Sequence, residues 1–257
     1  GQIKWTGADR AAFLEKCVVG DIKGLGAGEG RLSLLTNESG GILDDTVITN
    51  AGDYIYMVVN GACKVTDMAH LEKMMAENSD MDVQMNYLGD DATLVALQGD
   101  GAKTALQPLL PDGFDMERFA FMTGVDTTVG GMACRVTRCG YTGEDGFEIA
   151  VPKGSGGEHQ VVSLWNKILE SADVWPIGLG ARDWRRALPH LNMETVRRHV
   201  FVFPRVAYAP HRRPVFDDAV AGVVAYHKCF GPHLACCGLS QRFVDGVITD
   251  TIAAPQF

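Results

Sequence analysis

A sharp change in composition near residue 183 is the feature that most restricts how this chain of 257 residues can fold. Residues 1–183 carry 14 Lys and Arg against 27 Asp and Glu, a net charge of −13. Residues 184–257 carry nine against five, a net charge of +4, and eight of those nine basic residues are Arg. One coherent domain rarely changes so abruptly, so we expect a folded core at 1–183 and a separate tail at 184–257.

Composition also excludes several classes of protein. The acidic core argues against nucleic-acid binding, and the Arg pairs of the tail are diluted by apolar residues. No window approaches the run of about 18 apolar residues that a transmembrane helix needs, and the first residues lack the pattern of a secretory signal. Seven cysteines, an odd number without a C-x-x-C pair, indicate thiols in a reducing compartment. The spacing of Cys229, His233, Cys236 and Cys237 matches no usual zinc site, so we expect no metal.

Helices and strands are expected to alternate, with hairpins among them. The patterns predict a helix at 8–17, a hairpin of strands 31–36 and 42–49, a strand at 54–59 and a helix at 66–78. Further strands are expected at 81–88, 92–97, 126–129, 134–138 and 146–151, and further helices at 101–110 and 158–171. Such an order favours a mixed α+β sheet over a doubly wound parallel one.

The predicted strand at 42–49 carries a carboxylate between apolar neighbours. With a period of two, Leu43, Asp45 and Val47 share one face, just past a Gly-Gly turn. Loss of water around Asp45 should raise its pKa unless a donor or a cation meets it. Such a group suits proton transfer or a bound cation. The simpler alternative is an Asp on an edge strand that caps the turn.

A second candidate cluster lies at residues 139–148, where three glycines surround Tyr141 and lead into a strand. Glu148 lies on the opposite side of that strand from its two apolar neighbours. A carboxylate on a strand is held firmly and can accept paired N–H bonds from a planar heterocycle. Glu144 and Asp145 are explained more simply by a solvated loop.

Four stretches share an order and spacing that point to one family. They are residues 32–45, which end in Gly-Gly-Ile-Leu-Asp-Asp, residues 58–63, residues 134–148, which contain Cys-Gly-Tyr-Thr-Gly-Glu-Asp-Gly-Phe-Glu, and residues 178–183. Together they strongly resemble the T-protein family of the glycine cleavage system, the aminomethyltransferases, and most of all its mitochondrial branch. The resemblance covers 183 of the 257 residues, and its most specific part is residues 134–148.

The resemblance implies a fold and a reaction. The implied fold is the mixed-sheet, α+β, folate-binding T-protein fold, with its first two domains present and its C-terminal barrel-like domain absent. The family takes an aminomethyl group carried on the lipoyl arm of the H-protein, releases ammonia, and gives the methylene to tetrahydrofolate. The resemblance therefore implies tetrahydrofolate and the lipoylated H-protein as partners, and the mitochondrial matrix as the location.

Specific residues are implied as well. Asp45 would be the catalytic carboxylate beside the reacting folate nitrogens, and Glu148 would hold the edge of the pterin. The other residues expected to line the folate pocket are Tyr141, Arg182, Leu32, Val58 and Asn60.

The chain also departs from the family pattern. We expect the family's N-terminal segment to be absent, and nothing after Asp183 continues the resemblance. One alternative is therefore an inactive or regulatory form that at most binds folate. Others are an iron–sulfur assembly factor of the same fold and the folate domain of a dimethylglycine or sarcosine dehydrogenase. The sequence Arg-Cys-Gly-Tyr at 138–141, in place of the assembly factors' Lys-Gly-Cys-Tyr, and the presence of Asp45 favour the transferase.

The tail gives the first testable prediction. Six prolines in its 74 residues interrupt any long helix, and its apolar runs show no sustained period that would build a second core. Limited proteolysis should therefore remove the tail first and leave a body that ends near Asp183. Amide exchange that protected the tail as strongly as residues 42–49 would contradict this expectation and make the tail a domain of its own.

Overall fold

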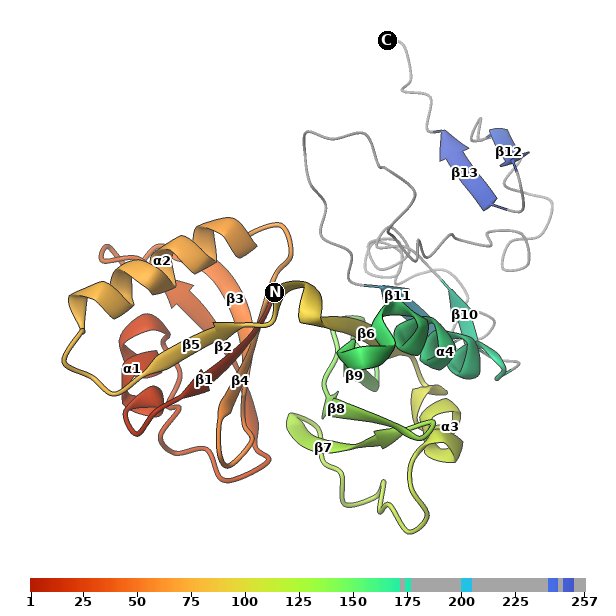
Figure 1. The fold of residues 1–257 in the computed structure, drawn as a ribbon, viewed down its shortest axis with the longest axis horizontal. Helices are drawn as coiled ribbons and strands as arrows, with labels where there is room; N and C mark the ends of the chain where they lie inside the picture. The colour runs from red at the N-terminus through yellow and green to blue at the C-terminus, as the bar shows by residue number, and fades with distance from the viewer. Residues whose placement is uncertain (172–173, 177–199, 205–239, 245–246, 252–257) are drawn as a thin grey trace.

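Two sheets, built one after the other along the chain, make up an α+β fold (Figure 1). The computed structural model describes residues 1–171, 174–176, 200–204, 240–244 and 247–251. Within each sheet almost all neighbouring strands are antiparallel, and one parallel pair makes the second sheet mixed. The expected mixed α+β class is confirmed.

The first sheet has five strands in the order β2-β3-β4-β1-β5. Its strands are β1 (Gln2–Thr6), β2 (Gly30–Thr36), β3 (Ile42–Asn50), β4 (Ile55–Val59) and β5 (Gln84–Tyr87), and its helices are α1 (Arg10–Cys17) and α2 (Lys64–Glu77). The helices cover one face, because alternate residues of the strands and the apolar stripes of both helices bury one another. Trp5 of β1 and Phe13 of α1 lie in this core with ring centroids 5.4 Å apart.

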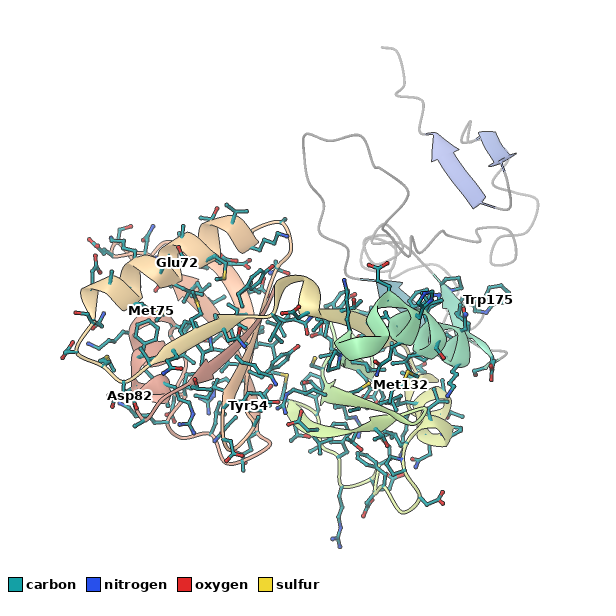
Figure 2. The ribbon with its side chains drawn as sticks, viewed as in Figure 1. Tyr54, Glu72, Met75, Asp82, Met132 and Trp175 are labelled. Atoms are coloured by element: carbon teal, nitrogen blue, oxygen red, sulfur yellow. The ribbon has the colours of Figure 1, made fainter. Side chains whose placement is uncertain are left out.

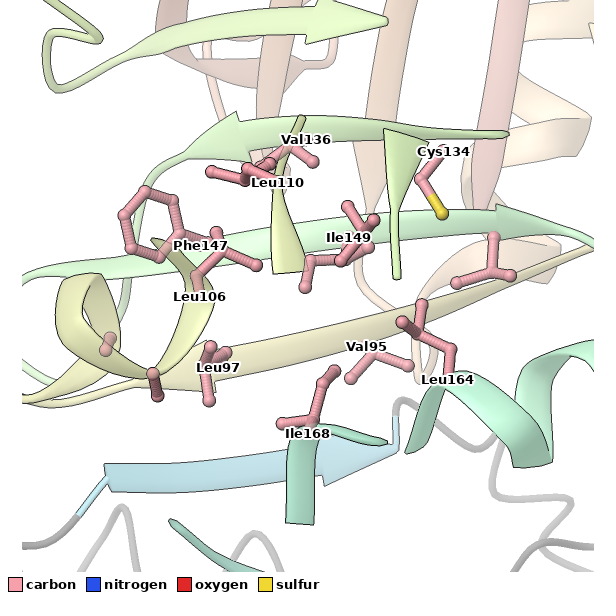
Figure 3. Packing of buried hydrophobic residues seen from close by; sticks show 14 of the residues in the cluster. Val95, Leu97, Leu106, Leu110, Cys134, Val136, Phe147, Ile149, Leu164 and Ile168 are labelled. Carbon is pink, nitrogen blue, oxygen red and sulfur yellow. The ribbon is translucent and has the colours of Figure 1, made fainter. Parts of the chain in front are cut away.

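The second sheet has six strands in the order β10-β11-β6-β9-β8-β7. Its strands are β6 (Ala92–Gln98), β7 (Thr123–Val129), β8 (Met132–Arg138), β9 (Gly146–Pro152), β10 (Val174–Pro176) and β11 (Val200–Pro204). Its helices are α3 (Ala102–Leu106), α4 (Gly157–Leu169) and the short 3-10 turns η1 (Gly89–Asp91), η2 (Gln107–Leu109) and η3 (Gly154–Gly156). Figure 3 shows the core, where Leu164 and Ile168 of α4 pack on Val95 and Ile149 of the sheet.

The faces that the helices leave open turn toward each other. Tyr56 and Val58 of β4 pack against Leu94 of β6 and Ala150 of β9, and we call these four residues the inter-sheet cluster. Polar contacts flank it: Gln2 accepts a hydrogen bond from the hydroxyl of Tyr56 at 2.7 Å and donates to the carbonyl of Ala92 at 3.2 Å. The two sheets therefore meet through a small apolar contact with hydrogen bonds beside it.

Tyr54 makes a further contact between the two sheets. Its hydroxyl reaches both carboxylate oxygens of Asp126 in β7, at 3.0 and 2.9 Å. Figure 2 shows Tyr54 on the side of the first sheet that lies nearest the second.

The predicted elements are found, with two informative differences. β1 was not predicted, yet it lies between β4 and β5 in the first sheet. The strand expected at 81–88 is shorter, because only Gln84–Tyr87 pairs with β1.

The tail contributes three described strands. β11 pairs with β6 of the core, and β12 (Ser240–Val244) pairs with β13 (Val247–Thr251). Most of residues 184–257 lies outside the described residues, so a boundary at Asp183 stays a prediction.

Candidate functional site

The side chains of β3, the strand that carries Asp45, do not alternate between the two faces of the sheet as predicted. Between Leu35 and Thr36 the register of β2 against β3 shifts, and Leu43 is the residue of β3 left without a partner. Leu43 consequently packs against the core under the helices, whereas Asp45 and Val47 point to the face that turns toward the second sheet. The expectation that two apolar neighbours desolvate Asp45 is therefore wrong: Asp45 is exposed. A bulge of this kind adds one residue to a strand and re-aims the side chains beyond it.

Asn60 fixes the position of Asp45. It follows the end of β4, and its side-chain amide donates to Oδ1 of Asp45 at 2.7 Å. The same amide donates to Oδ1 of Asp44 at 2.9 Å, while the backbone N–H of Asn60 donates to Oδ2 of Asp44 at 2.9 Å. One asparagine thus connects a buried carboxylate, Asp44, to an exposed one, Asp45.

These hydrogen bonds set the charge state of Asp44. Burial alone would raise the pKa of this carboxyl group, which is 7% exposed. The two hydrogen bonds from Asn60, with smaller ones from Asp67 and the backbone of Asp45, outweigh burial and hold the pKa below its ordinary value. Asp44 is therefore an anion beneath Asp45 at neutral pH.

Glu148 is buried on the inner face of the second sheet. It is 4% exposed and lies in β9 between Ala96 of β6 and Thr137 of β8, which are its partners in register. Its side chain shares the face of Ala150, which belongs to the inter-sheet cluster, because the two are separated by one residue of the strand. Its register partners, Ala96 and Thr137, both carry small side chains.

The loop between β8 and β9 carries Tyr141, which is half-buried. An ion pair closes this loop at its base: Arg138 donates from Nε to Oδ1 of Asp145 at 2.9 Å and from Nη2 to Oδ2 at 2.6 Å. Such a two-bond pair fixes geometry better than a single contact. The interpretation of Asp145 as a solvated loop residue is therefore wrong, since its carboxylate closes the loop.

Two glycines let this loop pass over Gln98. The amide of Gln98, which is fully buried, donates to the carbonyls of Cys139 and Phe147 at 3.2 and 3.3 Å. A Cβ at Gly140 or Gly146 would lie only 2.4 Å from side-chain atoms of Gln98. Glycine fits both positions because the backbone approaches the buried amide so closely that a larger residue would have to displace Gln98.

Leu32 and Val58 lie in one row across β2, β3 and β4, since each is paired with Val47. They therefore share the inward-facing side with Asp45, and Leu32 is 60% exposed there. Arg182 lies outside the described residues. The structure thus brings Asp45, Asn60, Leu32 and Val58 together on the first sheet and turns Glu148 toward them from the second.

A cavity of about 420 Å³ lies along the same inter-sheet surface. It is bordered by Tyr56 and Ala150 of the inter-sheet cluster and by Lys4, Arg135 and Asp126, but not by Asp45 or Glu148. Arg135 is 5% exposed and lies over the rings of Tyr54 and Tyr56, so it forms a wall of the cavity. Whether the expected site residues line one pocket around a ligand stays a prediction.

Among the residues that the structure describes, no group of three or more His, Cys, Asp or Glu side chains could hold a metal ion. Cys229, His233, Cys236 and Cys237 lie outside those residues. Nor is any helix in the described ranges long and apolar enough to cross a membrane.

Comparison with known proteins decides the family. The sequence profile of the GCVT N-terminal domain matches residues 1–192. The chain belongs to this family. In the crystal structure of glycine cleavage system aminomethyltransferase T from Bartonella henselae, the same fold recurs with a TM-score of 0.62 and 34% sequence identity, over 72% of this chain and 47% of that one.

Curated relatives of the GCVT N-terminal domain agree. The mitochondrial aminomethyltransferase of Dictyostelium discoideum is 44% identical over 189 residues, which are 71% of this chain and 46% of the relative. The mitochondrial aminomethyltransferase of Gallus gallus is 46% identical over 186 residues, which are 71% of this chain and 45% of the relative. The chain therefore spans about half the length of the relatives that it matches.

Two residues and one ion pair that organise the site were not predicted from the sequence. Asp44 was not among the expected site residues, although its hydrogen bonds with Asn60 hold Asp45 in place. Gln98 is the last residue of β6. It lies far along the sequence from Gly140 and Gly146, the glycines that pack against it. The ion pair between Arg138 and Asp145 could have been predicted from the sequence, because residues of opposite charge flank a glycine-rich loop that begins and ends on paired strands.

Substitution of Gly146 tests the packing of this loop. Gly146→Ala should lower the free energy of unfolding by about 1–3 kcal/mol, because the added methyl group displaces Gln98 from two buried carbonyls. Urea denaturation measures the change. Gly61→Ala is the control, since no atom lies within 4 Å of its added Cβ, and it should cost much less.

A double-mutant cycle makes the same test specific to Gln98. In a Gln98→Ala background, the cost of Gly146→Ala should fall by more than half, since the displaced side chain is gone. Equal costs in both backgrounds would show that the close approach of Gln98 does not matter.

Proposed function

We propose that this protein is an aminomethyltransferase of the glycine cleavage system. It would take the aminomethyl group from the lipoyl arm of the H-protein, release ammonia and transfer the methylene to tetrahydrofolate, in the mitochondrial matrix. The relatives from Dictyostelium discoideum and Gallus gallus are named mitochondrial aminomethyltransferases, which supports both the reaction and the location. The observation that carries the proposal is the pair Asp45 and Glu148, one on the inner side of each sheet.

Glu148 is suited to bind the pterin ring. A buried carboxylate accepts hydrogen bonds only, and two parallel N–H groups at the edge of a pterin match its two oxygens. Removal from water strengthens such bonds, because the local dielectric constant falls. Tyr141, Leu32, Val58 and Arg182 would form the remaining walls of the pocket.

Asp45 is suited to proton transfer at the reacting atoms. Two nitrogens of tetrahydrofolate form bonds to the methylene carbon and lose one proton each. The C–N bond of the aminomethyl group breaks and its nitrogen gains one proton to leave as ammonia, while the C–S bond breaks and the lipoyl sulfur gains the other as a thiol. Asn60 occupies Oδ1 of Asp45, so Oδ2 is left for substrate. The exposure of Asp45 fits this role, because the lipoyl arm has to arrive from another protein.

A binding isotherm with tetrahydrofolate tests the proposal on this chain. The chain should bind tetrahydrofolate, and Glu148→Gln should weaken binding by about tenfold or more, the usual loss when a charged hydrogen-bond partner is neutralised. Glu72→Gln is the matched control, because Glu72 is exposed on the outer side of α2 (Figure 2) and should leave affinity unchanged. No measurable binding by the unaltered chain would refute the proposed function.

Turnover tests the role of Asp45 separately. In a preparation that carries out the transfer, Asp45→Asn should lower kcat by about a hundredfold or more, the typical contribution of a positioned acid or base. Tetrahydrofolate affinity should change far less, because Asn keeps the shape of the side chain. Asp53→Asn, at an exposed loop position, is the control. A loss of less than about threefold in kcat would rule out the catalytic role.

A further inference from the structure

We propose that Asp67 is a positioning residue of this site: its carboxyl group carries a proton, donates it in a hydrogen bond to Asp44, and thereby holds Asn60 and Asp45 in place. The use of Asp45 in catalysis rests on the proposed function. The arrangement of Asp67, Asp44 and Asn60 does not.

Asp67 is a buried acid in the first turn of α2. It has no exposed surface, which is unusual for an Asp, and it is one of only two buried residues in that helix. Helix α2 packs on the covered face of the first sheet, to which Asp44 of β3 also points, because its register partner Leu35 lies in the core on that face. Two carboxyl groups therefore meet in one buried place.

A proton on one of the two carboxyl groups prevents two negative charges from being buried side by side. With both carboxylates ionised, neither oxygen of Asp67 would have a hydrogen-bond donor among the described residues, and two anions would share a site without water. A buried polar group without a partner costs stability. With one proton, one oxygen of Asp67 donates to Asp44 and the repulsion between two anions is removed, which leaves one uncharged oxygen of Asp67 without a donor.

The surroundings place that proton on Asp67 rather than on Asp44. Burial raises the pKa of Asp67 to about 7, and the neighbouring Asp44 contributes to this rise by charge repulsion and by its hydrogen bond. The hydrogen bonds from Asn60 keep Asp44 ionised. The two groups therefore titrate far apart, as pairs of acids with a shared proton do.

Asp44 connects Asp67 to the site through hydrogen bonds from Asn60. Both of its oxygens accept from Asn60, one from the backbone N–H and one from the side chain. The side-chain amide nitrogen of Asn60 also donates to Oδ1 of Asp45, at 2.7 Å. The chain Asp67–Asp44–Asn60–Asp45 thus leads from the helix side of the sheet to its inner side.

The titration of Asp67 has to be distinguished from that of other ionisable groups near it. Cys63 precedes α2. Burial is the largest cause that raises its pKa, and the negative charges of Asp44, Asp67 and Asp45 raise it further, so Cys63 stays a neutral thiol. The amino group of Gly1 donates to the carbonyl of Val59 and slightly lowers the pKa of Asp67. His70 lies one turn further along α2.

The direction of the pH effect follows from the raised pKa. Below pH 7 the proton is present and the hydrogen bond to Asp44 forms. As the pH rises through about 7, Asp67 ionises, the bond is lost and the two buried anions repel each other. The hydrogen bonds that Asn60 donates to Asp44 should weaken over the same pH range.

Nuclear magnetic resonance of the full chain tests this directly. The 13C signal of the Asp67 carboxyl group should titrate near pH 7, and the backbone and side-chain N–H signals of Asn60 should shift with the same midpoint. In Asp67→Asn, which stays neutral and can still donate to Asp44, the Asn60 signals should lose that midpoint. Asp80→Asn, at an exposed position, should keep it.

Binding gives the functional readout. Between pH 6 and 8.5, the Kd of the unaltered chain for tetrahydrofolate should rise by about fivefold or more, the lower end of ordinary coupling between sites. In Asp67→Asn it should stay within about twofold. A merely structural role for Asp67 would change the level of binding and not its dependence on pH.

Each outcome supports or overturns the proposal. An Asp67 carboxyl group that titrates near its ordinary value, or a midpoint at Asn60 that persists in Asp67→Asn, overturns it. A titration near pH 7 that reaches Asn60, together with no tetrahydrofolate binding at any pH, supports the positioning network and refutes the proposed function. If Asp67→Asn does not fold, the 13C titration and the Asn60 signals of the unaltered chain still distinguish these outcomes.

Discussion

The contact between the two open sheet faces is the constraint on which the candidate site depends. Four side chains form its apolar part, Tyr56, Val58, Leu94 and Ala150, and each would contribute at most about 1.5–3 kcal/mol by burial. Apolar burial has no preferred direction, so this contact alone does not fix how the two sheets are oriented. The bonds of Gln2 with Tyr56 and Ala92, and of Tyr54 with Asp126, add direction to it. Together they keep Asp45 and Glu148 on surfaces that face each other.

The two carboxylates are held in different ways that suit different tasks. Glu148 is buried in the middle of a strand between residues that are themselves in register, so its position is set by the sheet. Asp45 is exposed at the start of a strand, next to a bulge, and is set by the hydrogen bond from Asn60. A ring-binding carboxylate needs rigidity and low dielectric, whereas one that meets a substrate arriving from another protein needs access. The network beneath Asp45 gives it a fixed position without burying it.

Local sequence patterns predicted the elements and the family, but not the contacts that organise the site. Period-two and helical patterns located the hairpin of β2 and β3 and helices α1, α2 and α4, because each has one face in a core. The motifs at 134–148 pointed to the family that the GCVT profile confirms. The bulge at Leu43 could not be seen, since it depends on the register against a partner strand. The burial of Asp67 beside Asp44 depends on how a helix lies on a sheet, which no spacing along the chain records.

Under the proposed function, one ligand site lies between the inner faces of the two sheets and includes Asp45 and Glu148. Mapping of backbone amide shifts on addition of tetrahydrofolate tests it most directly. The largest changes should fall together at 44–47, 58–60 and 137–148, on both sheets at once. Changes confined to one sheet, or gathered around the cavity of Lys4, Asp126 and Arg135, would contradict it.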